Sequence, residues 1–193
     1  CFQQLVAKLR EQRFNPWQDL IISVGDLIDR GPDSLACLQL LRKPWFKSVR
    51  GNHEQMALDA LSAGEASMWL FNGGNWFSQL QEDEHQHAEQ ALLSCAQLPL
   101  ILELHCQSGI NIIAHADYPA TEYKWQQTLD EQAVLWSRER INNHISGVGK
   151  AIPGADHFWF GHTPLKQRLD VANQHYIDTG AVFGGELTMV QVQ

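Results

Sequence analysis

Four polar residues stand where apolar runs of the sequence end. Asp26 and Asn52 follow the first two of these runs, and His115 and His162 follow two later ones. Ligands of open α/β sheets bind at the carboxyl ends of the strands, so we expect these side chains to belong to one site. Their carboxylate, amide and imidazole donors suit Mn²⁺, Fe²⁺ or Zn²⁺ better than a metal that prefers thiolates. A pair of such ions needs a bridging carboxylate, and Asp26 has the two oxygens for that role.

Each of these residues has a plainer interpretation when it is taken alone. A single Asp, Asn or His at a strand end is more often a turn residue or a helix cap than a ligand. The order of the motifs argues against that account, because GDxxDRG follows one apolar run, GNHE the next, and His-Ala-Asp and Gly-His-Thr-Pro two more. Together they predict a metal site for two ions.

The apolar pattern predicts strands that alternate with helices, which is typical of the α/β class. Short apolar runs that end in polar loops predict strands at 19–24, 45–49, 100–106, 110–114, 156–160, 168–171, 175–177 and 187–192. Helical spacing predicts helices at 2–13, from residue 35, at 54–61 and at 84–98, the last within a cap-like helical insertion at 67–98. No linker or repeat interrupts the chain, so we expect a single domain over residues 1–193.

The composition excludes several classes of function. The chain has 193 residues, of which 44% are hydrophobic, and its net charge of −8 predicts no binding to nucleic acid. Its 4 cysteines form no CxxC pair, which favours reduced thiols and a cytoplasmic protein. No apolar run reaches the roughly 18 residues of a membrane-spanning helix, and the visible start lacks the pattern of a signal peptide, so we predict no membrane association.

The motifs in their order resemble those of the calcineurin-like metallophosphoesterases. Within that superfamily they are most similar to the phage-lambda-type serine/threonine protein phosphatases and the bacterial protein phosphatases A and B, through GDLIDRG at 25–31, VRGNHEQM at 49–56, AHADYP at 114–119, LWSRERI at 135–141, FGHTP at 160–164 and YIDTGAV at 176–182. The resemblance implies a four-layer α/β sandwich, with two mixed sheets flanked by helices. It also implies an enzyme that hydrolyses phosphomonoesters on phosphorylated protein or peptide substrates.

The resemblance implies a metal role for each of the four strand-end residues. Asp26 would bridge two divalent ions, most often Mn²⁺, while Asn52 and His115 bind one ion and His162 the other. The nucleophile would then be a hydroxide that bridges the metals. A histidine at the position of His175 sometimes joins such a site, but its place before a strand favours packing.

The same resemblance implies how phosphate is held and protonated. Arg30 and Arg138 would bind phosphate together with Asn52, although a surface ion pair is the plainer interpretation of each arginine. His53 would act as general acid, oriented by Asp29.

Three further residues near these motifs have no assigned role in catalysis. Arg50 and Arg140 are interpreted as members of surface ion pairs, and Asp117 either supports the site through its neighbours or turns the chain.

One expected motif lies outside the chain. In the family a strand and a GDxH motif precede the helix that here begins near Cys1, and the Asp and His of that motif complete the His162 metal. We therefore expect the gene product to begin some two dozen residues earlier, and this polypeptide alone to bind one ion and to turn over slowly.

Two alternatives to a protein phosphatase remain. One is a diadenosine-polyphosphate hydrolase of the same superfamily, although those enzymes usually have a small residue where Asp29 stands. The other is a catalytically impaired module that binds phosphoproteins.

Overall fold

The computed structural model describes residues 1–192, and the chain divides into two compact units, Cys1–Pro99 and the residues from Leu100 onward. The first unit contains a two-stranded sheet and the second a five-stranded sheet. Among the described residues no helix is both long and apolar enough to cross a bilayer.

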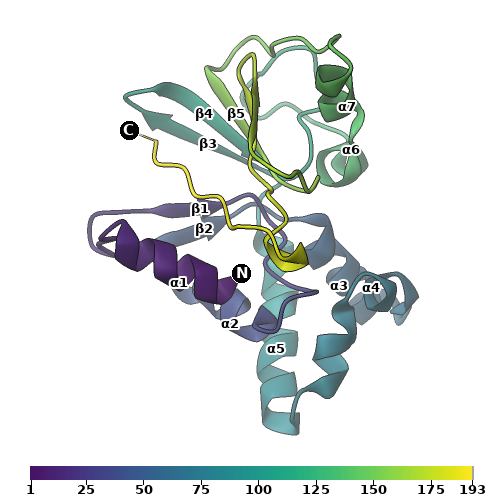
Figure 1. Cartoon of the computed structure of the whole chain (residues 1–193). Helices are drawn as coiled ribbons and strands as arrows, with labels where there is room; N and C mark the ends of the chain where they lie inside the picture. Colours follow the sequence, from purple (N-terminus) through teal and green to yellow (C-terminus); the bar gives the residue numbers. More distant parts are fainter. Residues whose placement is uncertain (193) are drawn as a thin grey trace. The chain divides into compact units, whose positions relative to one another are not determined.

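Two short parallel strands organise the first unit, and both were predicted from their apolar runs. They are β1 (Ile21–Ser23) and β2 (Phe46–Ser48), with Ser23 paired to Ser48. Both strands therefore end at the same edge, and the loops that lead to residues 26 and 52 begin there. Figure 1 shows α1 (Phe2–Glu11) running alongside this pair.

Helices make up most of the rest of the first unit. α2 (Ser34–Gln39) and the short 3-10 helix η1 (Leu40–Arg42) connect β1 to β2, and α3 (Asn52–Ala63) follows β2. The prediction began α3 two residues later, at residue 54. The helix starts instead directly after its N-cap, Gly51, so Asn52 and His53 lie in its first turn.

Short helices make up the segment that was predicted as a helical insertion. It contains α4 (Ser67–Phe71), η2 (Gly74–Gln79), α5 (Glu82–Ser94) and the terminal turn η3 (Cys95–Gln97). The prediction of one helix over 84–98 was wrong at both ends. Leu98 is extended, with ψ 131°, because the ring of Pro99 disfavours the helical conformation in the residue before it.

The second unit is built on a mixed sheet with the strand order β3-β4-β5-β7-β6. Its central strands β4, β5 and β7 are parallel, and β3 and β6 are antiparallel edge strands. The bounds are β3 Ile101–Cys106, β4 Gly109–Ala114, β5 His157–Phe160, β6 Leu169–Val171 and β7 Gln174–Tyr176.

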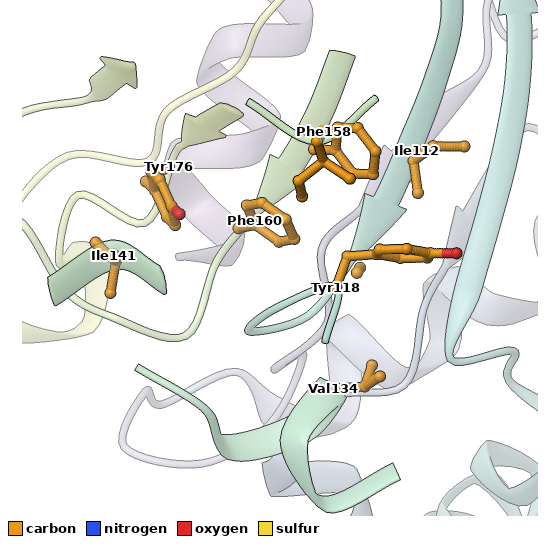
Figure 2. Packing of buried hydrophobic residues seen from close by; sticks show 9 residues of the cluster. Ile112, Tyr118, Val134, Ile141, Phe158, Phe160 and Tyr176 are labelled. Atoms are coloured by element: carbon orange, nitrogen blue, oxygen red, sulfur yellow. The ribbon is translucent and has the colours of Figure 1, made fainter. Parts of the chain in front are cut away.

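Helices α6 (Glu131–Trp136) and α7 (Glu139–Ile145) cover one face of this sheet. Figure 2 shows Val134 and Ile141 from these helices with Ile112, Phe158 and Phe160 from the strands, and all five are buried. Burying an aliphatic or aromatic side chain of this size contributes about 1.5–3 kcal/mol. This cluster therefore fixes β4 and β5, the two strands that lead into His115 and His162.

The C-terminal segment does not form the predicted strand at 187–192. After the short 3-10 helix η4 (Ala181–Phe183) the described residues belong to neither sheet. An alternating apolar pattern gives a segment the propensity of a strand, but a strand also needs a ladder partner, and the sequence of the segment does not encode one.

Candidate active site

The edge shared by β1 and β2 carries the first group of predicted site residues. Asp26 lies in the loop after β1, and Asn52 and His53 lie in the first turn of α3 after β2. The backbone N–H of His53 donates to Oδ1 of Asp26 at 3.2 Å. Two segments far apart in the sequence are thus joined at the predicted bridging carboxylate.

The buried carboxylate of Glu54 ties these two segments together. Its Oε2 accepts the backbone N–H groups of Asp26 at 2.9 Å and Gly51 at 2.8 Å, and its Oε1 accepts that of Leu27 at 2.7 Å. Glutamate at this third helical position commonly reaches back to the N-cap, but here it also holds the opposite loop. The GNHE motif in the sequence did not predict this role for Glu54.

Close packing at Gly51 leaves no room for a side chain. A Cβ at this position would lie 2.3 Å from Oδ1 of Asp26 and 2.7 Å from Oε2 of Glu54. The glycine of GNHE is therefore required so that the start of α3 can approach the Asp26 carboxylate.

Several predicted site residues have left-handed backbone conformations that side chains seldom adopt. Asp26, Asp29 and Arg30 have φ values of 56°, 74° and 60°, and His162 has 64°. Such conformations cost on the order of 1–3 kcal/mol each and tend to cluster at functional sites. The surrounding contacts must therefore hold these residues in place.

His53 and Asp29 form a buried pair, as predicted. Nδ1 of His53 lies 2.5 Å from Oδ2 of Asp29, and both side chains are almost completely inaccessible to solvent. Burial lowers the pKa of His53, but the hydrogen bond to Asp29 and the negative charges of Asp26 and Asp29 outweigh burial and raise that pKa above its ordinary value. The pairing with Asp29 thus favours the protonated imidazole, which can donate a proton from Nε2.

Two indole groups from the helical segment at 67–98 also bind Asp29. Nε1 of Trp69 lies 3.1 Å from both carboxylate oxygens, and Nε1 of Trp76 lies 2.7 Å from Oδ1. The backbone N–H of Asp29 donates to Oγ of Ser34 at 3.0 Å. Neither tryptophan was predicted as a site residue, because their separations of 40 and 47 residues from Asp29 leave no periodic signal in the sequence.

The Asn72-Gly73 turn of the same segment contacts Arg30. The guanidinium donates to Oδ1 of Asn72 at 3.1 Å, and a Cβ on Gly73, which has a φ of 108°, would lie 2.9 Å from Cγ of Arg30. The sequence indicated only a break between helices here. The turn in fact orients an exposed arginine that was predicted to bind phosphate.

In the second unit, His115 and His162 follow the adjacent parallel strands β4 and β5. The backbone N–H of Gly161 donates to the carbonyl of His115 at 2.8 Å, and the two imidazole rings lie 5.1 Å apart between centroids. His115 is fully buried, and His162 is half-buried, with Trp136 packed edge-on at 6.1 Å. The sheet therefore brings together the two histidines that were predicted as ligands.

Asp117 supports this region through hydrogen bonds and an ion pair. Its carboxylate accepts from Nε of Arg140 at 2.7 Å, from Oγ of Ser137 at 3.1 Å and from the backbone N–H of Tyr118 at 2.7 Å. Arg140 was interpreted as part of a surface ion pair; the ion pair is present, but its exposure was wrongly predicted, because the Arg140 side chain is largely buried against Asp117. Arg138, between Ser137 and Arg140, is exposed at the N-cap of α7.

His175 packs on the sheet, in line with the predicted packing role. Its ring stacks on Trp159 at 4.2 Å, its Nδ1 lies 2.6 Å from Asp170, and its Nε2 lies 2.9 Å from Nδ1 of His157. Both ring nitrogens of His175 are thus engaged by neighbours within the sheet.

The chemistry of the donors fits divalent ions in each unit. The first unit offers the Asp26 carboxylate beside the buried Asn52, and the second offers two imidazoles, so each supplies hard or borderline ligands without a thiolate. A histidine poised to donate and an arginine with an anchored guanidinium add the groups that phosphoester hydrolysis requires.

Comparison with known proteins agrees with this chemistry. Residues 1–166 match the calcineurin-like phosphoesterase family, and the chain belongs to that family. Membership implies an enzyme that works with divalent metal ions. The resemblance inferred from the motifs is confirmed.

The chain matches two related proteins over its whole length. It is 58% identical over 193 residues to serine/threonine-protein phosphatase 1 of Salmonella typhimurium strain LT2, and the match covers 100% of this chain and 88% of that protein. It is 44% identical over 192 residues to serine/threonine-protein phosphatase 2 of Escherichia coli strain K12, with the same coverage, 100% and 88%.

A solved structure with a similar fold supports the architecture. The protein is named as a candidate diadenosine tetraphosphatase, and the match has a TM-score of 0.66 at 21% identity, covering 96% of this chain and 81% of that one. The predicted α/β fold with two sheets flanked by helices is confirmed.

Proposed function

We propose that this chain is a metal-dependent serine/threonine-type protein phosphatase, which hydrolyses phosphomonoesters on phosphorylated proteins or peptides. The observation that carries the proposal is the buried His53–Asp29 pair, placed beside the Asp26 loop at the start of α3. The high identity to two proteins named as serine/threonine-protein phosphatases supports it.

The metal site in this proposal takes two divalent ions, with Mn²⁺ as the best match to the donors. Asp26, Asn52, His115 and His162 would be the residues of this chain that hold them. When bound, the ions activate water and neutralise charge on the phosphoryl group. We also propose that residues 1–193 work as a single domain.

The residues of this chain have separate tasks in the reaction. Arg30 and Arg138, together with Asn52, bind the phosphate oxygens, and Asn72 holds the Arg30 guanidinium in advance. His53 donates the proton on Nε2 to the leaving oxygen of serine or threonine, while Asp29 fixes the ring through Nδ1. Such a leaving group needs a proton, because an alkoxide leaves poorly.

The buried Asp29 favours a phosphatase over a diadenosine-polyphosphate hydrolase. The resemblance associates those hydrolases with a small residue at this position, which would leave His53 without its carboxylate partner. We propose phosphoproteins as the partners, and we retain the prediction of a cytoplasmic protein that binds neither nucleic acid nor membrane.

The test uses the protein that carries this chain, supplied with Mn²⁺ and para-nitrophenyl phosphate. We expect turnover that EDTA abolishes, and release of phosphate from phosphoserine and phosphothreonine peptides well in excess of diadenosine tetraphosphate cleavage. Turnover that persists without metal, or a preference for the dinucleotide, contradicts the proposal.

His53→Asn tests the role of the proton donor. We expect kcat for a phosphoserine peptide to fall about 10²–10⁴-fold while the metal content, measured by plasma mass spectrometry, stays the same. His87→Asn is the matched control, because His87 is an exposed residue of α5 whose Nδ1 contacts only the Asp83 carbonyl in this region. If His53→Asn loses metal instead, His53 has a different role.

A further inference from the structure

The Asp29 carboxylate has more donors than a simple histidine partner requires. Besides His53 it accepts the indole N–H of Trp69 at 3.1 Å, in a buried hydrogen bond, and that of Trp76 at 2.7 Å, in a partly buried one. An indole N–H only donates, so both tryptophans interact favourably with the ionised carboxylate. Hydrogen bonds to a charged group are roughly twice as strong as those between neutral groups.

The two tryptophans are themselves fixed by packing. Their rings meet edge-on at 6.4 Å, and Phe77 packs against both, at 5.4 Å from Trp69 and 5.9 Å from Trp76. A Cβ on Gly74 would lie 2.6 Å from the Trp69 ring, so the first residue of η2 packs directly against that indole. The aromatic group therefore presents its two N–H groups at defined positions.

Asp29 needs this support because its backbone is strained. Its φ of 74° is one that aspartate seldom adopts, and the next residue is also left-handed. A carboxylate on such a loop could rotate about its side-chain bonds. The two indoles leave it one orientation, in which Oδ2 accepts from Nδ1 of His53.

We propose that Trp69 and Trp76 are positioning residues for the proton donor, and that the helical segment at 67–98 acts on the reaction through them. The two indoles hold Asp29 so that it binds Nδ1 of His53 and directs Nε2 toward the leaving oxygen. This inference rests on the proposed function. It also explains why the segment at 67–98 packs against the loop that contains residues 29 and 30.

The dependence of the rate on the leaving group is the decisive measurement. Proton donation matters for phenyl phosphate, whose leaving group is basic, and little for 2,4-dinitrophenyl phosphate, whose leaving group departs as an anion. We expect Trp76→Phe to lower kcat for phenyl phosphate about tenfold with little change in KM, and to change kcat for the dinitrophenyl ester less than about twofold.

Two variants separate this role from packing. Phe77→Leu disturbs the same aromatic group without removing a donor to Asp29, and Trp17→Phe makes the same substitution at a side chain that is 93% exposed. Trp17→Phe should leave the ratio of the two rates unchanged, and Phe77→Leu, which keeps both indole donors, should alter the ratio less than Trp76→Phe does. If Phe77→Leu alters the ratio as much as Trp76→Phe does, or if Trp76→Phe slows both esters equally, the indoles have no positioning role.

A double-mutant cycle tests whether the effect passes through Asp29. In an Asp29→Asn background, Trp76→Phe should cost less than about twofold in kcat for phenyl phosphate, because the carboxylate that it positions is gone. A full additional tenfold loss in that background contradicts the proposal.

A spectroscopic arm distinguishes this inference from the proposed function. In the ¹⁵N-labelled chain, the indole N–H signals of Trp69 and Trp76 should exchange slowly with solvent, and Asp29→Asn should shift both while leaving that of Trp17 in place. If the signals behave in this way but no phosphoester is hydrolysed, the proposed function fails and the contact stands. If Asp29→Asn leaves the signals unmoved, the inference fails whatever the activity.

Discussion

In the first unit, side chains from distant parts of the sequence hold the loop that contains Asp26, Asp29 and Arg30. In the second unit, His115 and His162 lie just after two strands that pair with each other. Glu54 holds the first part of that loop, and Asn72 and the two indoles hold the second. By contrast, the ladder between β4 and β5 sets the spacing of the two histidines.

This difference has a physical cause. The first loop contains three non-glycine residues with positive φ, and no backbone ladder can hold such a segment, so it depends on hydrogen bonds from buried side chains. The histidines lie at the ends of strands that a buried apolar cluster already holds. We therefore expect single substitutions to disrupt the site in the first unit more than in the second.

Replacement of Glu54 should have the largest effect on stability. Glu54→Ala leaves three backbone N–H groups without their acceptor, and each buried donor that loses its partner costs about 1–3 kcal/mol. We expect a loss of about 4 kcal/mol in the free energy of unfolding, measured by urea denaturation with circular dichroism. Glu65→Ala, at an exposed glutamate after α3, should change it by less than about 0.5 kcal/mol. A loss below about 1 kcal/mol for Glu54→Ala would show that the three hydrogen bonds accepted by the Glu54 carboxylate contribute little to stability.

Replacement of Asp117 should have an intermediate effect. The Asp117 carboxylate, 6% exposed, pairs with the Arg140 guanidinium, which is 22% exposed. Asp117→Ala removes that carboxylate, but Arg140 keeps its hydrogen bonds to the carbonyls of Tyr118 and Ala120. We expect the free energy of unfolding to fall by about 2 kcal/mol in the same assay.

The matched control is Asp170→Ala in the same unit. Asp170 pairs with Arg168, but these side chains are 48% and 32% exposed, so the loss should stay within about 1 kcal/mol. Equal losses for the two aspartates would show that burial of the Asp117 pair does not matter.

The smallest expected effect concerns the four thiols, which are all free. Burial raises the pKa of Cys37 to about 11 and that of Cys95 to about 12, so at pH 8 neither provides much of the thiolate that reacts with iodoacetamide. Cys106, in the second unit, is half-buried. Cys1 is half-buried as well, so mass spectrometry of the folded chain should find Cys1 and Cys106 labelled before Cys37 and Cys95. Fast labelling of Cys95 would mean that the first unit opens more readily than its packing suggests.

The candidate site residues and the strands that lead to them could be predicted from the sequence alone, and the structure contains those strands. Apolar runs that end in Asp26, Asn52, His115 and His162 are local features, and a strand end or helix start depends mainly on nearby residues. The order of the motifs also identified the family, and it pointed to the pairing of His53 with Asp29.

How those residues are held became visible in the folded chain and could not be predicted from the sequence. Glu54 reaches Leu27 across 27 residues, Arg30 reaches Asn72 across 42, and Trp76 reaches Asp29 across 47. Contacts of this kind have no periodicity in the sequence, because they depend on where two loops meet after folding. The same reason explains the failed strand at 187–192, since its residues specify an extended backbone but not a neighbour to pair with.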